Sequence, residues 1–135
     1  MATRAQRVLV VDDDLEIRAL VAATLRRDGY TVVEAGDGPE AMAVARRLIP
    51  DLVLLDMTLP GMDGVEVARQ LKANPLLSAV PVVALSALTH RAVRERALAA
   101  GCAHYLTKPC PPAALRDVVA QMLAATGARP GRPVS

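Results

Sequence analysis

Four apolar runs of this sequence lead into polar residues that can do chemistry. These residues are Asp12 and Asp13, then Asp56, then Ser86, and finally Lys108. Carboxylates held close together repel one another unless a divalent cation or an ammonium group compensates them. Oxygen ligands without histidine or cysteine favour Mg²⁺ over zinc. A magnesium ion, an ammonium group and a hydroxyl around a carboxylate make up a phosphoryl-transfer site, in which Asp56 is the expected nucleophile and forms an acyl phosphate.

The run that ends on Asp56 is the best candidate for a central strand. Residues 52–55 are all apolar, and turn-forming residues follow, including Pro60-Gly61, which suits a type II turn. Four apolar residues are too few for a buried helix, so a strand covered on both faces is predicted. Open α/β sheets bind their ligands at the carboxyl ends of such strands. Taken alone, this stretch also fits an Asp56 that only caps the strand.

Strands and helices are predicted to alternate along the chain and so to bring these polar residues together. The strands are expected at 7–11, 31–35, 52–55, 81–86 and 103–106, and the helices between Asp14 and Gly29, from 36–39 to 49–50, and at 65–73, 89–100 and 111–125. Short connections between apolar strands imply right-handed crossovers and a doubly wound parallel sheet. We therefore expect an α/β protein of the flavodoxin-like (βα)5 type with strand order 2-1-3-4-5, in which the four polar strand ends share one rim.

The ends and the face of the first helix are also predicted. Asp14 is placed to cap its N-terminus, and Gly29 is placed to end it. Its inward face is expected to consist of residues at helical spacing, namely Ile17, Leu20, Val21, Thr24 and Leu25.

Composition sets the broad class. The chain has 135 residues, 53% of them hydrophobic, with no Phe or Trp, so it predicts one domain with an aliphatic core. No apolar run reaches the ~20 residues of a membrane span, and no signal peptide is recognisable, so a cytoplasmic protein is expected. Cys102 and Cys110 have no metal-type spacing and are predicted to be packing thiols. The net charge of +2 comes without a basic stripe interleaved with aromatics, which disfavours nucleic-acid binding.

Four segments of the chain resemble the receiver domain of response regulators in bacterial two-component signalling. They are residues 10–14, 51–64, 83–87 and 101–109, and the resemblance covers about residues 7–125. It implies a receiver domain at 7–125, preceded by a flexible N-terminus at 1–6. Residues 126–135 are rich in Pro, Gly and Arg and are expected to be a disordered tail or the start of a linker.

The resemblance implies a role for each residue of the rim. Asp56 is the expected phosphoacceptor. Asp13 is expected to ligate Mg²⁺ directly and Asp12 mainly through water, with Asp56 and the backbone carbonyl of Met57 as further ligands. Lys108 is expected to pair with the phosphoryl group.

The resemblance also implies a switch. Ser86 is the expected switch hydroxyl, and Tyr105 the aromatic side chain that moves inward with it. The Lys108–Pro109 peptide bond is expected to be cis, an isomer found in only about 5–6% of X-Pro bonds.

Partners follow from the same resemblance. The phosphodonor is expected to be a sensor histidine kinase or a phosphotransfer protein. The output is expected to be a downstream protein bound through the fourth helix, the fifth strand and the fifth helix, where the exposed candidates are Arg91, Arg94, Glu95, Leu98, His104 and Tyr105. An inert basic helix fits the same residues. A phosphorylation-dependent homodimer is a further partner that the resemblance allows, whereas direct DNA binding and a membrane contact are not expected.

The sequence also fits functions other than that of a phosphorylated regulator. The expected protein is not an enzyme beyond its own phosphorylation and dephosphorylation, and it is either a stand-alone regulator or part of a longer chain. An Mg²⁺-dependent phosphatase with an aspartate nucleophile would use Asp12 and Asp14, and a phosphorylation-independent interaction module is a third possibility. The absence of a Gly-x-Gly-x-x-Gly motif after the first strand disfavours a dinucleotide carrier.

One residue near the site departs from the family pattern. Cys110 stands where the family commonly has Phe, and Thr58 and Leu88 flank the site.

Overall fold

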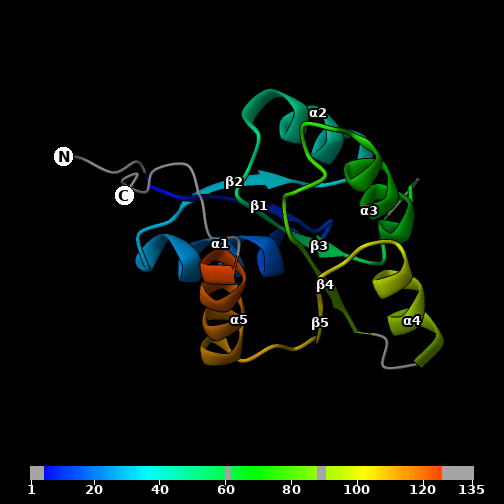
Figure 1. Ribbon diagram of the computed structural model, residues 1–135. Helices are drawn as coiled ribbons and strands as arrows, with labels where there is room; N and C mark the ends of the chain where they lie inside the picture. The colour runs from blue at the N-terminus through cyan, green and yellow to red at the C-terminus, as the bar shows by residue number, and fades with distance from the viewer. Residues whose placement is uncertain (1–4, 60–61, 88–90, 126–135) are drawn as a thin grey trace.

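The computed structural model describes residues 5–59, 62–87 and 91–125, and these form a parallel sheet with helices on both faces (Figure 1). The strands are β1 (Arg7–Val11), β2 (Thr31–Ala35), β3 (Leu52–Asp56), β4 (Val82–Ser86) and β5 (His104–Thr107). The helices are α1 (Leu15–Arg27), α2 (Gly38–Leu48), α3 (Gly64–Ala73), α4 (Arg91–Ala99) and α5 (Pro112–Ala125). The strand order is β2-β1-β3-β4-β5 and every pairing is parallel. The predicted α/β architecture and strand order are confirmed.

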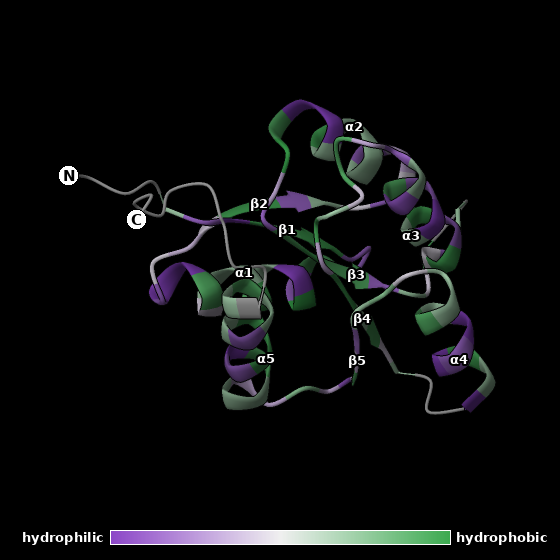
Figure 2. Ribbon diagram, in the orientation of Figure 1, coloured by the Kyte–Doolittle hydropathy of each residue, from purple (hydrophilic) through white to green (hydrophobic). Residues whose placement is uncertain are grey.

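The sheet separates two apolar layers. On one face, Leu9, Val53 and Leu55 pack with residues of α2, α3 and α4, whereas on the other face Val8 and Leu54 pack with residues of α1 and α5. Every residue of β3 and β4 is buried. Figure 2 shows the mainly hydrophobic central strands between helices that carry both hydrophilic and hydrophobic residues. Since side chains alternate across a strand, an uninterrupted apolar run is required where helices cover both faces.

Side chains at the strand-to-helix turns fix where three helices begin. Asp14 accepts a hydrogen bond from the Ile17 amide at 3.0 Å, Asp37 one from the Glu40 amide at 2.8 Å, and Asp63 one from the Val65 amide at 2.7 Å. Each bond satisfies an amide that lacks a partner within the first turn of its helix. Gly29 follows α1 with φ +94°, the left-handed conformation that favours glycine. The predicted cap at Asp14 and helix end at Gly29 are confirmed.

The predicted inward face of α1 is correct only in part. Leu25 is fully buried, but Leu20 is 66% and Ile17 is 39% exposed, and the small Ala22 lies inside instead. The helix touches the sheet and α5 along a narrow stripe, so the apolar residues beside that stripe face solvent. Some element ends also differ by one residue from the prediction. Strand β4 begins at Val82 and not at residue 81, β5 covers His104–Thr107 and not 103–106, and α4 ends at Ala99 and not at residue 100.

Several sequence-based predictions fall on residues outside the described ranges. These concern the Pro60-Gly61 turn, Leu88, the start of the fourth helix at 89–90, most of the N-terminal segment, and the tail at 126–135. Within the part of the chain that the structure describes, no helix is both long enough and apolar enough to cross a membrane. Cys102 and Cys110 are free thiols, and burial raises the pKa of Cys102 to about 11, in keeping with packing roles.

Candidate functional site

The predicted polar residues meet at the carboxyl edge of the sheet. The strand register places Val11 beside Leu55, Asp56 beside Leu85, and Ser86 beside Thr107. The residues that follow these positions therefore project from one rim. Asp12, Asp13, Asp56, Ser86 and Lys108 all lie there, each at or just after the end of its strand.

Asp12 is the most firmly held of these residues. Its carboxylate is buried and accepts a hydrogen bond from the Lys108 ammonium at 2.6 Å. The second carboxylate oxygen accepts from the backbone amide of Asp14 at 2.9 Å, and the amide of Asp12 itself donates to the Ala35 carbonyl at 3.1 Å. A charge-assisted bond of this length is strong where water is largely excluded. These contacts fix the position of the Asp12 carboxylate.

Asp56 is an ionisable group almost without water contact, because only 3% of its surface is exposed. Its Oδ1 accepts from the Thr58 amide at 3.0 Å, and its Oδ2 lies 3.4 Å from the Lys108 ammonium. Burial raises the pKa of Asp56, and the nearby Asp12 charge adds to this, whereas the Thr58 amide and Lys108 oppose it without reversing it. A carboxylate whose charge is only partly compensated is receptive to a further cation.

Lys108 connects the two buried carboxylates. Burial alone would lower its pKa, but the hydrogen bond to Asp12 and the charges of Asp56 and Asp12 outweigh burial, so the pKa is raised and the ammonium stays protonated. The Lys108 amide donates to the Ser86 carbonyl at 2.8 Å, which ties this segment to the end of β4. The peptide bond from Lys108 to Pro109 is cis.

Three carboxylates are close enough to share a cation. One oxygen from each of Asp12, Asp13 and Asp56 lies within 4.8 Å of the others; we call these three residues the acidic cluster. The Met57 carbonyl accepts from the Gly64 amide at 3.1 Å, and a carbonyl oxygen has a second lone pair to offer. Oxygen donors of this kind suit Mg²⁺, and the exposed Asp13 leaves the cluster open to solvent on one side. The donor set therefore fits a hard divalent cation.

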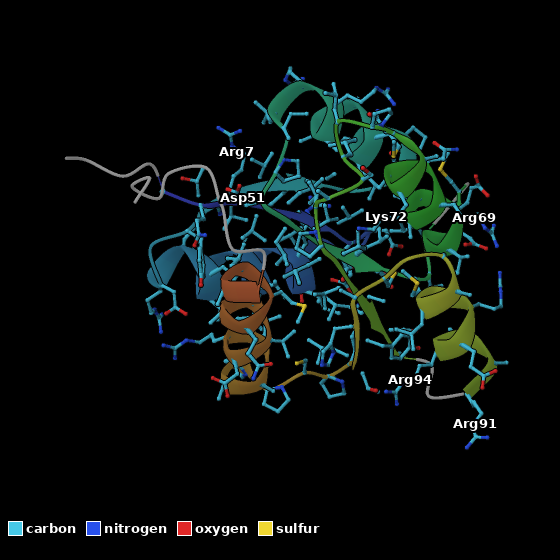
Figure 3. The ribbon with its side chains drawn as sticks, in the orientation of Figure 1. Arg7, Asp51, Arg69, Lys72, Arg91 and Arg94 are labelled. Atoms are coloured by element: carbon cyan, nitrogen blue, oxygen red, sulfur yellow. The ribbon has the colours of Figure 1, made fainter. Side chains whose placement is uncertain are left out.

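The predicted switch residues lie near this site but differ in burial. Ser86 is completely buried, and Tyr105 is half-buried against the layer that contains α2, α3 and α4. Tyr105 pairs with Ala84 in the sheet, two residues before Ser86. On α4, Arg91 and Arg94 are exposed and extend from the helix into solvent (Figure 3). His104 is half-buried, and its Nδ1 accepts from the Tyr105 amide at 2.9 Å.

Two residues that support the site were not singled out from the sequence. Arg18 donates from Nη1 to the backbone carbonyl of Asp12 at 2.8 Å. Gly64 approaches the end of β3 so closely that an added Cβ would lie 2.5 Å from the Asp56 carbonyl oxygen. Gly64 stands in a segment that carried the resemblance, but its role depends on a spatial approach that spacing does not reveal. Nothing in the sequence pattern distinguishes Arg18 from the other arginines.

Comparison with known proteins assigns this site to a family. The model of the response regulator receiver domain matches residues 8–120. The DNA-binding response regulator MtrA of Mycobacterium tuberculosis is 41% identical over 124 residues, which make up 92% of this chain and 52% of that protein. The response regulator PleD of Caulobacter vibrioides is 46% identical over 103 residues, or 76% of this chain and 23% of PleD. This chain thus spans about half the length of MtrA.

Solved structures agree with the family match. The chemotaxis protein CheY4 of Vibrio cholerae superposes with a TM-score of 0.85 at 30% identity, over 88% of this chain and 99% of that one. The receiver domain of the sensor histidine kinase PA1611 of Pseudomonas aeruginosa superposes with a TM-score of 0.83 at 33% identity, over 90% and 99% of the two chains. That structure contains a magnesium ion coordinated in its active-site cleft.

Proposed function

Because this chain belongs to the response regulator receiver family of two-component systems, we propose that Asp56 accepts a phosphoryl group from a phosphohistidine of a partner protein. The observation that carries the proposal is the buried Asp56 carboxylate, which lies 3.4 Å from the Lys108 ammonium and within the acidic cluster. A nucleophilic carboxylate beside fixed positive charge suits covalent phosphoryl transfer.

The step forms one bond and breaks one. A carboxylate oxygen of Asp56 attacks the phosphorus, the P–N bond to the donor imidazole breaks, and its electron pair stays on the imidazole nitrogen. The product is an acyl phosphate on Asp56. Lys108 holds its proton and offers its ammonium to the phosphoryl oxygens, so part of its contact with Asp12 is exchanged for a contact with the new group.

The acidic cluster and the Met57 carbonyl would hold Mg²⁺. When bound, this ion neutralises negative charge on the phosphoryl oxygens, which is where charge gathers during transfer. The donor set of the cluster and the magnesium ion in the related PA1611 receiver support this assignment.

The consequence of phosphorylation is a change of surface. The Ser86 hydroxyl moves to donate to a phosphoryl oxygen, and Tyr105 fills the space that Ser86 vacates. The face formed by α4, β5 and α5, including the exposed Arg91 and Arg94, then binds a downstream protein. The chain functions in the cytoplasm, either alone or as the receiver part of a longer regulator, and MtrA and PleD are longer proteins of this kind.

The direct test is the intact mass of the protein after incubation with Mg²⁺ and acetyl phosphate. One phosphoryl group per molecule is expected, and a chelator of divalent cations is expected to prevent its addition. Absence of the adduct with every small phosphodonor would mean that the fold works as an interaction module without phosphorylation. Repeated turnover of phosphoesters would instead support the phosphatase alternative.

The phosphodonor protein is expected to dock on α1. Leu15 is 65% and Leu20 66% exposed, and both lie on α1, the helix that follows Asp12 and Asp13 in the chain. Exposed apolar side chains on a helix that begins at the site suit contact with a partner that delivers a phosphoryl group. Leu20→Arg is expected to slow transfer from a phosphorylated kinase or phosphotransfer protein at least about tenfold, because an apolar side chain that the complex would bury is lost and a charge is introduced.

Leu76→Arg is the matched control for this prediction. Leu76 is 74% exposed in the connection before β4, at the opposite edge of the sheet from the site. Both variants are expected to react with acetyl phosphate like the wild type, since neither side chain belongs to the site. Equal rates of transfer from the protein donor to Leu20→Arg and Leu76→Arg would exclude α1 as the docking surface.

A further inference from the structure

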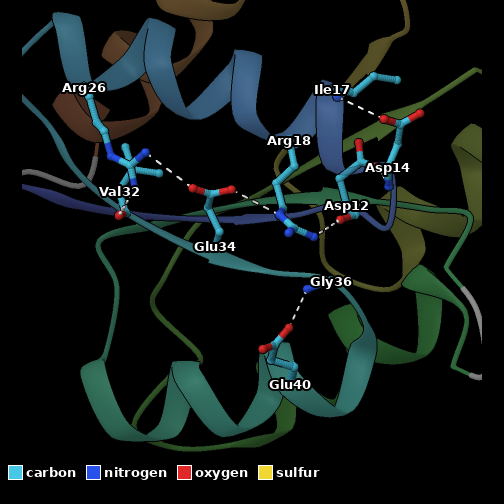
Figure 4. A network of polar contacts seen from close by, with 9 residues as sticks. All are labelled: Asp12, Asp14, Ile17, Arg18, Arg26, Val32, Glu34, Gly36 and Glu40. Atoms are coloured by element: carbon cyan, nitrogen blue, oxygen red, sulfur yellow. Dashed lines mark hydrogen bonds and ion pairs between the residues drawn. The ribbon is translucent and has the colours of Figure 1, made fainter.

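Arg18 is the centre of a polar network beside the acidic cluster (Figure 4). From α1, its Nη1 donates to the Asp12 carbonyl at 2.8 Å, and its Nε pairs with Oε1 of Glu34 on β2 at 3.1 Å. The second oxygen of Glu34 pairs with Arg26 at 3.4 Å, and Arg26 also donates to the Val32 carbonyl at 3.0 Å. Of the three residues Arg18, Glu34 and Arg26, Arg18 is thus the one that donates to a backbone carbonyl of the acidic cluster, that of Asp12.

The carbonyl that Arg18 contacts belongs to the peptide between Asp12 and Asp13. Strand β1 ends at Val11, so this carbonyl lies beyond the regular hydrogen bonding of the sheet. The orientation of this peptide sets the direction in which the Asp13 side chain leaves the backbone. Asp12 is already held through its carboxylate by Lys108, whereas Asp13 is exposed and depends on its backbone for its placement.

Part of the positive charge of Arg18 is offset within the network, where Glu34 pairs with both Arg18 and Arg26. A guanidinium near a cation site would repel the cation, but Glu34 forms an ion pair with this one, and only 17% of the Arg18 side chain is exposed. Arg18 therefore brings a strong, rigid donor to the peptide, while Glu34 offsets part of its positive charge. A donor of this kind can orient the Asp13 carboxylate without taking the place of the cation that the carboxylate would bind.

We propose that Arg18 is a positioning residue that holds the Asp12–Asp13 peptide, and through it the Asp13 carboxylate, in the geometry that binds a divalent cation. The inference rests on the proposed function of the acidic cluster as an Mg²⁺ site. The competing explanation is that Arg18 only ties α1 to β2 and so contributes to stability alone.

The experiment is a titration with MgCl₂ alone, followed through the NMR amide shifts of Asp13 and Asp14, for the wild type and for Arg18→Met. Methionine keeps much of the length of arginine but donates no hydrogen bond. Binding of Mg²⁺ to Arg18→Met is expected to be about tenfold weaker than binding to the wild type, the loss typical when a group that orients a metal ligand is removed.

Arg26→Met is the matched control, because it removes one ion pair of Glu34 but leaves the bond from Arg18 to Asp12. Its Mg²⁺ affinity is expected to stay within about twofold of the wild type, and thermal unfolding without Mg²⁺ compares the stability of the two variants.

The outcomes separate the two explanations. Weak binding by Arg18→Met with normal binding by Arg26→Met supports the positioning role. Normal or tighter binding by Arg18→Met, or an equal loss in both variants, overturns it. If Arg18→Met does not fold, Arg18→Lys decides, because a single ammonium cannot keep both the Glu34 pair and the Asp12 bond with their present geometry, and intermediate affinity is expected. A wild type that binds no Mg²⁺ would refute the proposed metal site itself, a result distinct from a failure of Arg18 alone.

Discussion

Replacing Asp56 with asparagine is expected to abolish the phosphoryl adduct completely in the presence of Mg²⁺ and acetyl phosphate. The asparagine amide has no anionic oxygen to attack phosphorus, although its carbonyl oxygen can still accept the bond from the Thr58 amide. The fold is therefore expected to be preserved while the reaction is lost. Intact mass spectrometry of the two proteins under identical conditions measures the difference.

Asp51→Asn is the matched control for this substitution. Asp51 is a buried carboxylate that immediately precedes β3, where it accepts from the Arg7 amide at 2.7 Å, far from the acidic cluster at the other end of the strand. This variant is expected to take up one phosphoryl group like the wild type. An adduct that persists in Asp56→Asn would show that another residue accepts the phosphoryl group.

The same Asp56→Asn variant is expected to be more stable than the wild type at about pH 7 without Mg²⁺. Burial raises the pKa of Asp56 above its ordinary value of 3.8, so the folded state binds a proton more readily than the unfolded state. Wild-type stability therefore falls as the pH rises through the folded-state pKa, whereas asparagine does not titrate. Thermal unfolding across this pH range should show the two proteins converging as the pH approaches 3.8. A wild type more stable than the variant at neutral pH would contradict this account.

A single methyl group at Gly64 is expected to cost about 3 kcal/mol of unfolding free energy, at the upper end of what overpacking usually costs. A Cβ there would lie 2.5 Å from the Asp56 carbonyl oxygen and 2.6 Å from the Met57 Cα. Both are backbone atoms, so neither can rotate away as a flexible side chain could. The end of β3 would have to move, and the Met57 carbonyl, which is bonded to the Gly64 amide, would move with it.

Urea denaturation of Gly64→Ala without Mg²⁺ measures this cost, and Gly29→Ala provides the comparison. At Gly29 nothing lies within 4 Å of an added Cβ, so only the strain of φ +94° is expected, about 1 kcal/mol. Gly64→Ala should also bind Mg²⁺ more weakly, whereas Gly29→Ala should not. Equal losses of stability at the two glycines would show that the space around Gly64 is not the limiting factor.

The fold and the meeting point of the site residues could be predicted because the signals were local and repeated. Each of β1, β3 and β4 is a continuous apolar run that stops at a polar residue, and once the strand order is known these stops must share one edge. The positions of Asp12, Asp56 and Ser86 followed from that argument, and Lys108 followed from its place just after the fifth strand. The residue roles in phosphorylation come from the family resemblance and remain predictions.

Other features depend on side-chain packing, which the sequence pattern does not contain. In a chain whose interior is built from Ala, Val and Leu, the buried stripe of α1 could not be distinguished from its flanks, and Leu20 was wrongly placed inside. The contact between Arg18 and the Asp12 carbonyl depends on the conformation of a long side chain and on the proximity of β2. The contact of Gly64 with β3 depends on how closely two backbone segments approach.

The ion pair between Asp12 and Lys108 has a consequence for the newly made protein. The two residues are separated by 96 positions in the sequence, one after the first strand and one after the last. A chain still emerging from the ribosome has its aspartates long before it has the lysine that compensates them. Such a nascent chain lacks the lysine of the proposed phosphorylation site, so phosphorylation is expected only after β5 and Lys108 have been synthesised.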